Sequence, residues 1–279
     1  MPQPRRAPAP IRCGSTALEF GRRTYLVGII NMTPDSFAGD GLGDDAAAAE
    51  ALGERWKEQG ADILDVGGHS TRPGAARVPV DEELRRTIPA VRRLVRLGLP
   101  VSVDTFSAPV AAAALEAGAA MVNDVTALTG DPGMAGVVAR AGAPVVLMDG
   151  RNRRGTADIM AETRAYLNER IAAAAAAGVD PSRTIIDPGY GFGVTVGQNM
   201  EMLRRLRELT ALGRPVLIGT SRKGSIGRIL NLPVHELMEG TAATIVIAIA
   251  NGADLVRVHD VRAMARVARM TDAIVRGLP

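Results

Sequence analysis

Short apolar segments alternate with longer amphipathic segments along the chain from residue 24 onward. The apolar segments are nearly continuous in Val, Ile and Leu, which is typical of parallel strands that are buried on both faces. The amphipathic segments repeat with the period of helices. The predicted strands are residues 24–30, 61–67, 100–105, 120–125, 144–148, 184–189, 215–220 and 253–258.

Eight strands joined by seven helical crossovers, with a closing helix, predict a (β/α)₈ barrel of the α/β class. Several helical segments end in a glycine just before the next strand, as at Gly60 and Gly252, which fits a helix C-cap. A doubly wound sheet is the alternative, but no G-x-G-x-x-G opens a helix after the first strand, which disfavours a dinucleotide site. The clearest predicted helices are residues 44–59, 82–97, 108–117, 158–177 and 261–275.

The chain is predicted to hold one domain, residues 13–279, after a disordered or extended tail, residues 1–12, because no linker interrupts the alternation. Residues 11–23 are predicted to form a short β-hairpin that plugs the bottom of the barrel. The tail is rich in Pro and Arg and lacks the apolar region of a signal peptide. No apolar segment is long enough to span a bilayer, so we predict a cytoplasmic location and no membrane partner.

Composition narrows the range of partners. The chain has 33 Lys and Arg against 30 Asp and Glu, and the basic residues are scattered rather than clustered. Nucleic acid is therefore not an expected partner, whereas a small anionic substrate is compatible with this balance. The single cysteine, Cys13, excludes an intrachain disulfide. The three histidines lack the spacing of a zinc site.

Polar residues gather at the carboxyl ends of the predicted strands, where barrels of this kind carry their active sites. If polar residues merely marked the ends of strands, they would be found at both ends, but the opposite ends carry Ala, Gly and Pro. In chain order, these polar positions are Asn31, His69, Asp104, Asn123, Asp149, Asp187, Ser221, Lys223, Arg257 and His259.

The loops at these strand ends also hold half of the aromatic residues. Of the eight in the chain, four fall there, and aromatic rings around a polar pocket suit a flat heteroaromatic ligand. Two of the loops, residues 31–43 and 67–79, exceed the usual length of such connections and are predicted to be lids. The four aromatic residues are Phe37, Phe106, Tyr190 and Phe192.

Seven motifs lie at these strand ends. They are NMTPDSF (31–37), GGHSTRPG (67–74), SVDT (102–105), NDV (123–125), DPGYGFG (187–193), SRK (221–223) and RVHDV (257–261). In this order they resemble the dihydropteroate synthase family, from about residue 24 to the C-terminus. Each motif alone is a weak to moderate signal, and the ordered set, with each motif at a strand end, is a strong one.

The resemblance implies a pterin-binding (β/α)₈ barrel and a transferase of folate biosynthesis. The implied reaction condenses 6-hydroxymethyl-7,8-dihydropterin pyrophosphate with p-aminobenzoate to give 7,8-dihydropteroate and pyrophosphate. The pyrophosphate is implied to depart first, leaving a cation delocalised into the pterin, so no protein nucleophile is expected. The resemblance also implies Mg²⁺, a homodimer formed through the last helices, and a target for sulfonamides.

The resemblance further implies roles for individual residues. A carboxylate can accept two adjacent N–H donors of a pterin edge, which is the role implied for Asp187. The implied pterin contacts are Asp104, Asn123, Asp187, Lys223, Phe192 and Met148. Those implied for p-aminobenzoate and the lids are Phe37, Thr71, Arg72, Pro73 and Ser221. Those implied for pyrophosphate are Asn31, Arg257 and His259, with Mg²⁺ at Asn31, and the implied catalytic residues are Asp104, Lys223, Arg257 and His259.

Three positions depart from the family pattern: His69 replaces Glu, Asp149-Gly150 replaces His-Met, and Val194 replaces Lys. We expect His69 to hydrogen-bond within its own loop, and the arginines at 151, 153 and 154 to lie in a solvated loop. Two alternatives stay open. One is a pterin-binding paralogue with weak or no synthase activity, and the other is a methyltetrahydrofolate-binding methyl-transfer protein.

Overall fold

The computed structural model describes residues 7–33, 41–69 and 78–278. Within these ranges, eight parallel strands form one sheet in the order β8-β7-β6-β5-β4-β3-β10-β9. A bridge between Ile186 and Val216 links the two edges of this sheet. The strands are β3 (Tyr25–Asn31), β4 (Ile63–Gly67), β5 (Val101–Asp104), β6 (Met121–Asp124), β7 (Val145–Met148), β8 (Thr184–Asp187), β9 (Leu217–Ile218) and β10 (Leu255–Val258).

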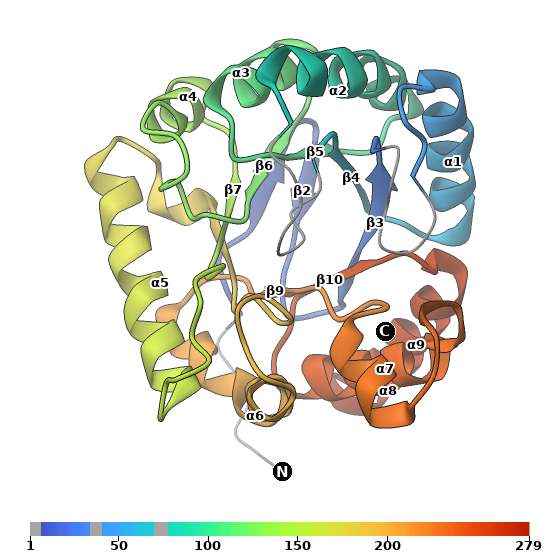
Figure 1. The fold of residues 1–279 in the computed structure, drawn as a ribbon, viewed down its shortest axis with the longest axis vertical. Helices are drawn as coiled ribbons and strands as arrows, with labels where there is room; N and C mark the ends of the chain where they lie inside the picture. The colour runs from blue at the N-terminus through green and yellow to red at the C-terminus, as the bar shows by residue number, and fades with distance from the viewer. Residues whose placement is uncertain (1–6, 34–40, 70–77, 279) are drawn as a thin grey trace.

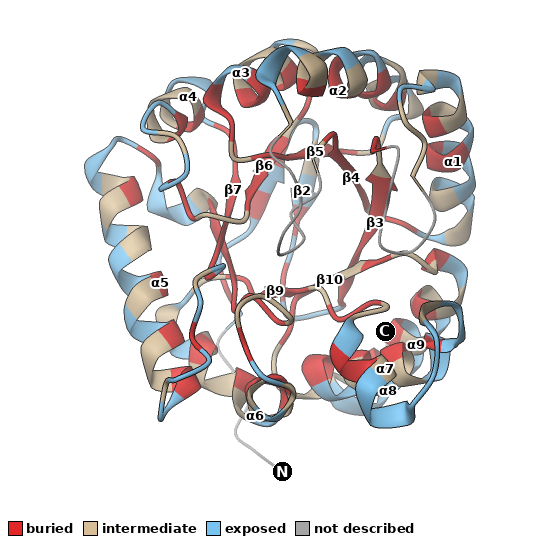
Figure 2. Ribbon diagram, viewed as in Figure 1, coloured by how far each residue is buried: buried red, intermediate tan, exposed pale blue. Residues whose placement is uncertain are grey.

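Helices form a ring outside the strands, so the predicted (β/α)₈ barrel is confirmed (Figure 1). Figure 2 shows that the strands are buried and that the outer faces of the helices are exposed. The α-helices are α1 (Ala46–Gln59), α2 (Val80–Leu94), α3 (Ala108–Glu116), α4 (Met134–Ala141), α5 (Ile159–Ala176), α6 (Val196–Arg205), α7 (Gly224–Leu230), α8 (Met238–Ala250) and α9 (Val261–Val275). Short 3₁₀ helices are η1 (Val95–Leu97), η2 (Pro181–Arg183), η3 (Leu206–Leu212) and η4 (Val234–Glu236).

The ends of α1 show how local sequence sets these boundaries. Asp45 caps the helix by accepting hydrogen bonds from the backbone N–H groups of Ala47 and Ala48. Gly60 ends it in the left-handed conformation, with φ of 101°, as the helix-ending glycine predicts. The predicted helix 82–97 instead begins at Val80 and tightens after Leu94 into η1.

An N-terminal hairpin closes the bottom of the barrel, as predicted. Its strands are β1 (Ile11–Cys13) and β2 (Thr16–Leu18), so it begins inside the segment predicted as a tail, residues 1–12. Buried side chains of the hairpin and of Phe20 pack on inward-facing residues of the barrel strands. The bottom of the barrel is therefore filled by apolar groups, which leaves the opposite, polar end for ligands.

Among the residues that the structure describes, no helix is both long enough and apolar enough to cross a membrane.

Candidate active site

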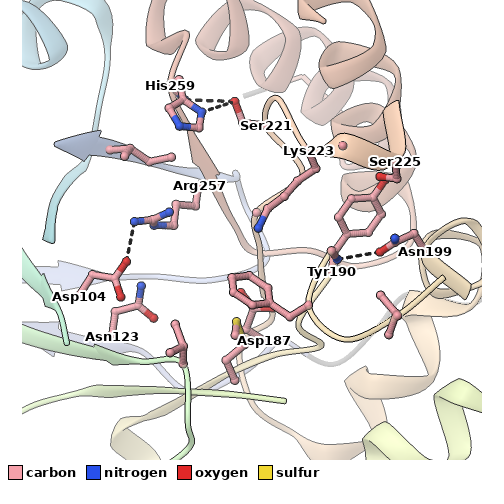
Figure 3. Close-up of a pocket in the computed structure, with 18 of the residues that line it drawn as sticks. Asp104, Asn123, Asp187, Tyr190, Asn199, Ser221, Lys223, Ser225, Arg257 and His259 are labelled. Atoms are coloured by element: carbon pink, nitrogen blue, oxygen red, sulfur yellow. Dashed lines mark hydrogen bonds and ion pairs between the residues drawn. The ribbon is translucent and has the colours of Figure 1, made fainter. Parts of the chain in front are cut away.

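A cavity of about 380 Å³ opens at the carboxyl ends of the barrel strands. Every site residue that the family resemblance implies and that the structure describes lines this cavity, whereas the strand-end candidates Asp149 and Phe106 do not. The implied residues that line it are Asn31, Asp104, Asn123, Met148, Asp187, Phe192, Ser221, Lys223, Arg257 and His259. The remaining predictions, Phe37, Thr71, Arg72 and Pro73, lie outside the described residues. Side chains from both sides of the barrel point into one space, as Figure 3 shows.

Strand alternation explains why these polar side chains face inward. Alternate residues of a barrel strand point to the interior, so an inward residue recurs every second position. In three strands, an apolar residue of the bottom cluster is followed two positions later by a polar residue of the cavity. These pairs are Met121 with Asn123, Ile185 with Asp187, and Leu255 with Arg257. Each strand therefore supplies both an apolar floor and a polar wall.

Arg257 bridges two buried carboxylates in the middle of the cavity. Its Nε donates to Asp65 Oδ2 at 2.6 Å, and its Nη2 donates to Asp104 Oδ2 at 2.8 Å. Asn123 Nδ2 also donates to Asp65 Oδ2, at 3.2 Å. Asp104 Oδ1 is buried and has no hydrogen-bond partner among the described residues, so it can accept a hydrogen bond from a ligand.

Asp65 is a site residue that sequence reasoning missed. It is 1% exposed and orients two residues of the predicted site, Arg257 and Asn123. The available signal was its position as the one acidic residue in the apolar strand β4, two residues before Gly67. An inward carboxylate at that depth needs a buried partner, and Arg257 is that partner.

Burial shifts the pKa values of three residues in the cavity. It raises the pKa of Asp104 to about 7, against the attraction of Arg257 and with the repulsion of Asp65. It raises the pKa of Asp187 to about 6, although the Gly189 N–H and Lys223 favour the carboxylate. Burial and the nearby Arg257 lower the pKa of Lys223 to about 8. All three groups thus change charge close to neutral pH, which is typical of functional sites.

The loop after β9 holds Lys223 in place. Ser221 Oγ lies 2.9 Å from His259 Nδ1 and accepts from the His259 backbone N–H at 3.2 Å. Arg222, in the left-handed conformation with φ of 54°, pairs with Asp260 at 2.6 Å. Lys223 Nζ then lies 4.0 Å from the centre of the Phe192 ring, a cation–π contact. The loops after β9 and β10 are therefore tied to each other beside the cavity.

The three departures from the family pattern have different outcomes. His69 Nδ1 accepts from the Val78 N–H at 3.3 Å, so it bonds within its own loop as expected. The expectation of a solvated arginine loop is wrong for Arg153, which is 1% exposed, and for Arg151, which is half-buried, because both pair with buried Asp149. It is confirmed for Arg154, which is exposed. Val194 is buried and lines the cavity.

Comparison with known proteins agrees with this site. The family described as "Pterin binding enzyme" matches residues 27–259. A dihydropteroate synthase of Bacillus subtilis is 44% identical over 260 residues, which cover 93% of this chain and 91% of the relative. The chain belongs to the dihydropteroate synthase family. The resemblance predicted from the seven motifs is confirmed.

Solved structures of the dihydropteroate synthase family match the whole barrel. A Xanthomonas albilineans dihydropteroate synthase with 4-aminobenzoic acid has a TM-score of 0.90 and 44% identity, covering 98% of this chain and 100% of that one. The same enzyme in complex with 7,8-dihydropteroate has a TM-score of 0.88 and 42% identity, covering 97% and 100%. The family likeness therefore extends over the barrel and all the described site residues.

Proposed function

We propose that this protein is a transferase that condenses 6-hydroxymethyl-7,8-dihydropterin pyrophosphate with p-aminobenzoate. The products are 7,8-dihydropteroate and pyrophosphate. The observation that carries this proposal is the convergence of Asp104, Asn123, Asp187 and Lys223 on one cavity. Its volume, about 380 Å³, lies in the range of small-molecule sites. The relatives named above carry the same activity in their names.

Four polar side chains suit the edge of a pterin ring. Asp187 as a carboxylate would accept two adjacent N–H donors, and the free Oδ1 of Asp104 would accept another. Asn123 offers both a donor and an acceptor. Lys223, held over Phe192, would donate to the 4-oxo group. Met148 and Phe192 line the same cavity and supply apolar surface for the ring.

Asn31, Arg257 and His259 would receive the pyrophosphate. A guanidinium binds phosphate oxygens well, because its N–H groups form a planar fork. No cluster of three His, Cys, Asp or Glu that could hold a metal occurs in the described ranges. Asn31 would nevertheless suffice as a protein ligand of Mg²⁺, because this ion commonly takes most of its ligands from water and substrate phosphates. When bound, it would supply charge neutralisation for the leaving pyrophosphate.

The reaction breaks the C–O bond between the pterin methylene and the pyrophosphate, which leaves with the bonding electrons. A C–N bond then forms between the methylene and the arylamine, whose nitrogen gives up a proton. Arg257 and His259 would stabilise the departing charge, and the carboxylate of Asp104 would stabilise the cation on the pterin. The role of the protein is thus electrostatic and positional, and no side chain needs to act as a nucleophile.

A direct assay tests the proposal and both alternatives. Purified protein with the pterin pyrophosphate, p-aminobenzoate and Mg²⁺ is expected to release pyrophosphate and form dihydropteroate. A methyl-transfer protein would release none, and a weak paralogue would bind the pterin without turnover.

Removal of Mg²⁺ with a chelator is expected to weaken binding of the pyrophosphate form by about tenfold or more, and to leave the pyrophosphate-free pterin alcohol unaffected. Equal binding of the pyrophosphate form with and without the ion would contradict the magnesium proposal.

Pterin binding is expected to depend on pH with a maximum near neutrality. Asp187 must be ionised to accept N–H donors, and so must Asp104, so binding is lost as pH falls through their pKa values of about 6 and about 7. Lys223 must be protonated to donate, so binding is lost as pH rises through its pKa of about 8. Fluorescence titration of the pterin alcohol from about pH 5 to about pH 9 measures this profile. A constant affinity across that range would count against these roles.

We further propose a homodimer formed through the last two α-helices. Apolar side chains of α8 and α9 remain exposed, with Ile247 at 45%, Met270 at 63% and Ile274 at 69%. Exposed apolar surface of this kind commonly marks protein interfaces. Sedimentation equilibrium is expected to give twice the chain mass of 29.2 kDa for the wild type. A monomer mass at micromolar concentration would contradict the proposal.

Sulfonamides are proposed to compete with p-aminobenzoate, because they are arylamines of similar shape. The residues implied to contact that substrate, apart from Ser221, lie outside the described part of the chain. The cytoplasmic location likewise stays a prediction from the sequence.

A further inference from the structure

Arg153 is a buried cation next to the cavity that the proposed reaction does not use. Its side chain is 0% exposed, although the residue lies in the connection between β7 and α5. A buried charge is unfavourable unless its partners are arranged around it, and a buried ion pair by itself is weak evidence of stability. The contacts of Arg153 therefore indicate which part of the structure it holds in place.

One set of contacts neutralises the guanidinium. Nη1 donates to Asp149 Oδ2 at 3.0 Å and to Thr163 Oγ1 at 2.6 Å. Nη2 donates to the Asp149 carbonyl at 2.7 Å. Asp149 is itself 0% exposed and also pairs with Arg151 at 2.9 Å. The carboxylate is thus shared between two arginines and keeps one partner if the other is removed.

A second set of contacts reaches the glycine-rich loop after β8, residues 189–193. Arg153 Nη2 lies 3.4 Å from the carbonyl oxygens of both Gly189 and Phe192. The Arg153 backbone N–H donates to the Gly193 carbonyl at 2.6 Å, and the Arg153 carbonyl accepts from Gln198 Nε2 at 2.8 Å. One residue therefore fastens this loop through both its side chain and its backbone.

The loop and the segment that contains Arg153 are in direct backbone contact. Gly189 has φ of 72°, and a Cβ there would lie 2.0 Å from the Asp149 carbonyl oxygen. Gly193 has φ of 57°, and a Cβ there would lie 2.2 Å from the Arg151 carbonyl oxygen. No side chain fits between the two segments at these points, so a shift of one segment must move the other.

The fastened loop carries groups that the pterin site needs. The Gly189 N–H donates to Asp187 Oδ1 at 2.7 Å, which orients that carboxylate and favours its charged form. Phe192 supplies the ring beneath Lys223 Nζ. Both contacts originate in the loop whose carbonyl oxygens face Arg153.

We propose that Arg153, neutralised by Asp149, is a positioning residue that holds the 189–193 loop so that Asp187 and Lys223 present matched groups to the pterin. The inference rests on the proposed function and extends it. Arg153 does not touch the substrate in this arrangement. Arg153 therefore affects the binding of the pterin and not the binding of p-aminobenzoate.

The test compares Arg153→Met with a matched control at the other end of the barrel. Arg276 is a half-buried arginine that pairs with Asp272 at 2.8 Å and donates to the Ala253 carbonyl at 2.9 Å. Arg276→Met therefore removes a comparable ion pair far from the cavity. For each protein, the measurements are the thermal midpoint, the Kd of 6-hydroxymethylpterin at several pH values, and the KM of p-aminobenzoate.

Arg153→Met is expected to raise the pterin Kd by about tenfold or more, because charged hydrogen bonds that fix the loop are lost. The acid limb of pterin binding is expected to move to higher pH, since Asp187 loses both an oriented N–H donor and the nearby positive charge of Arg153. The KM of p-aminobenzoate should stay within about twofold, and Arg276→Met should leave the pterin Kd within about twofold despite a lower thermal midpoint. A pterin Kd unchanged in Arg153→Met would overturn the inference.

A second variant covers the case in which Arg153→Met does not fold. Arg153→Lys keeps a positive charge beside Asp149 but lacks the fork that reaches both Gly189 and Phe192. It is expected to fold and to raise the pterin Kd by about threefold or more. A wild-type Kd in this variant would overturn the inference alone. Failure of the wild-type protein to bind 6-hydroxymethylpterin would instead overturn the proposed function together with it.

Discussion

Asp187→Asn is expected to lower kcat/KM for the pterin substrate by about 100-fold or more. The carboxylate would accept two N–H groups of the pterin, and each hydrogen bond to a charged group contributes about 1.5 kcal/mol or more. Asparagine keeps the shape but presents an amide N–H₂ in place of one acceptor oxygen. One of the two pterin donors would then face another donor. Steady-state kinetics with the pterin pyrophosphate varied, at saturating p-aminobenzoate, measures the loss.

The same substitution is expected to stabilise the free protein. The pKa of Asp187 is about 6 in the folded protein against 3.8 for an ordinary aspartate, so its contribution to stability falls as pH rises through 6. At pH 7 this charged group costs about 3 kcal/mol. Asparagine removes the charge, so the thermal midpoint should rise by about 2 °C or more, which excludes unfolding as the cause of lost activity.

Asp124→Asn is the matched control for Asp187→Asn. Asp124 is 0% exposed at the end of β6, which β7 separates from β8, but its oxygens accept from the N–H groups of Thr126 and Leu128 in its own loop. Burial also raises the pKa of Asp124, but both of its oxygens accept backbone N–H groups, and the amide N–H₂ of Asn would face one of those donors. Its substitution should therefore lower stability and change kcat/KM by no more than about threefold. If both aspartate variants lost activity equally, the specific role of Asp187 would be wrong.

Arg257→Leu is expected to lower kcat by about 100-fold to 1,000-fold, as the loss of a preorganised donor to a developing anion typically does. It is also expected to lower the free energy of unfolding by about 3 kcal/mol, because Asp65 and Asp104 would be left buried without their shared cation. Kinetics and denaturant unfolding measure the two effects separately.

Arg257→Lys separates charge from geometry. Lysine keeps the positive charge but cannot bridge two carboxylates as a planar fork does. Compared with Arg257→Leu, this variant should recover part of the stability and little of the activity.

The loss of affinity in Arg257→Leu should be larger for the pterin pyrophosphate than for the pterin alcohol. An equal loss for both ligands would place Arg257 away from the pyrophosphate.

Much of the fold was predictable because strand and helix patterns are local. Apolar segments such as 24–30 and 253–258 predict buried parallel strands. The end of α1 at Gly60 was predictable because glycine readily adopts the left-handed conformation that ends a helix. The polar site residues that were predicted and that line the cavity could be found because polar residues at carboxyl strand ends must converge in a barrel. Topology, not proximity in sequence, brings them together.

Asp65 and Arg153 were missed for reasons that are also physical. The partner of Asp65 is Arg257, 192 residues further along the chain, and no local pattern reports such a pair. Arg153 lies among polar residues in a segment that reads as a solvated loop. Arg153 is buried because the loop after β8 contacts it through the Gly189 and Phe192 carbonyl groups. The connections after β7 and after β8 are distant in sequence, so this contact leaves no local pattern.

The most direct test of the site is a crystal structure of the protein with 6-hydroxymethylpterin pyrophosphate. We expect a pterin ring in the cavity, with its 2-amino edge on the Asp187 carboxylate and its 4-oxo group on Lys223 Nζ. Asp104 and Asn123 should contact the remaining ring nitrogens, and the pyrophosphate should lie toward Arg257 and His259. A pterin bound elsewhere, or one in the cavity whose ring edge touches neither Asp187 nor Lys223, would show the proposed pterin site to be wrong.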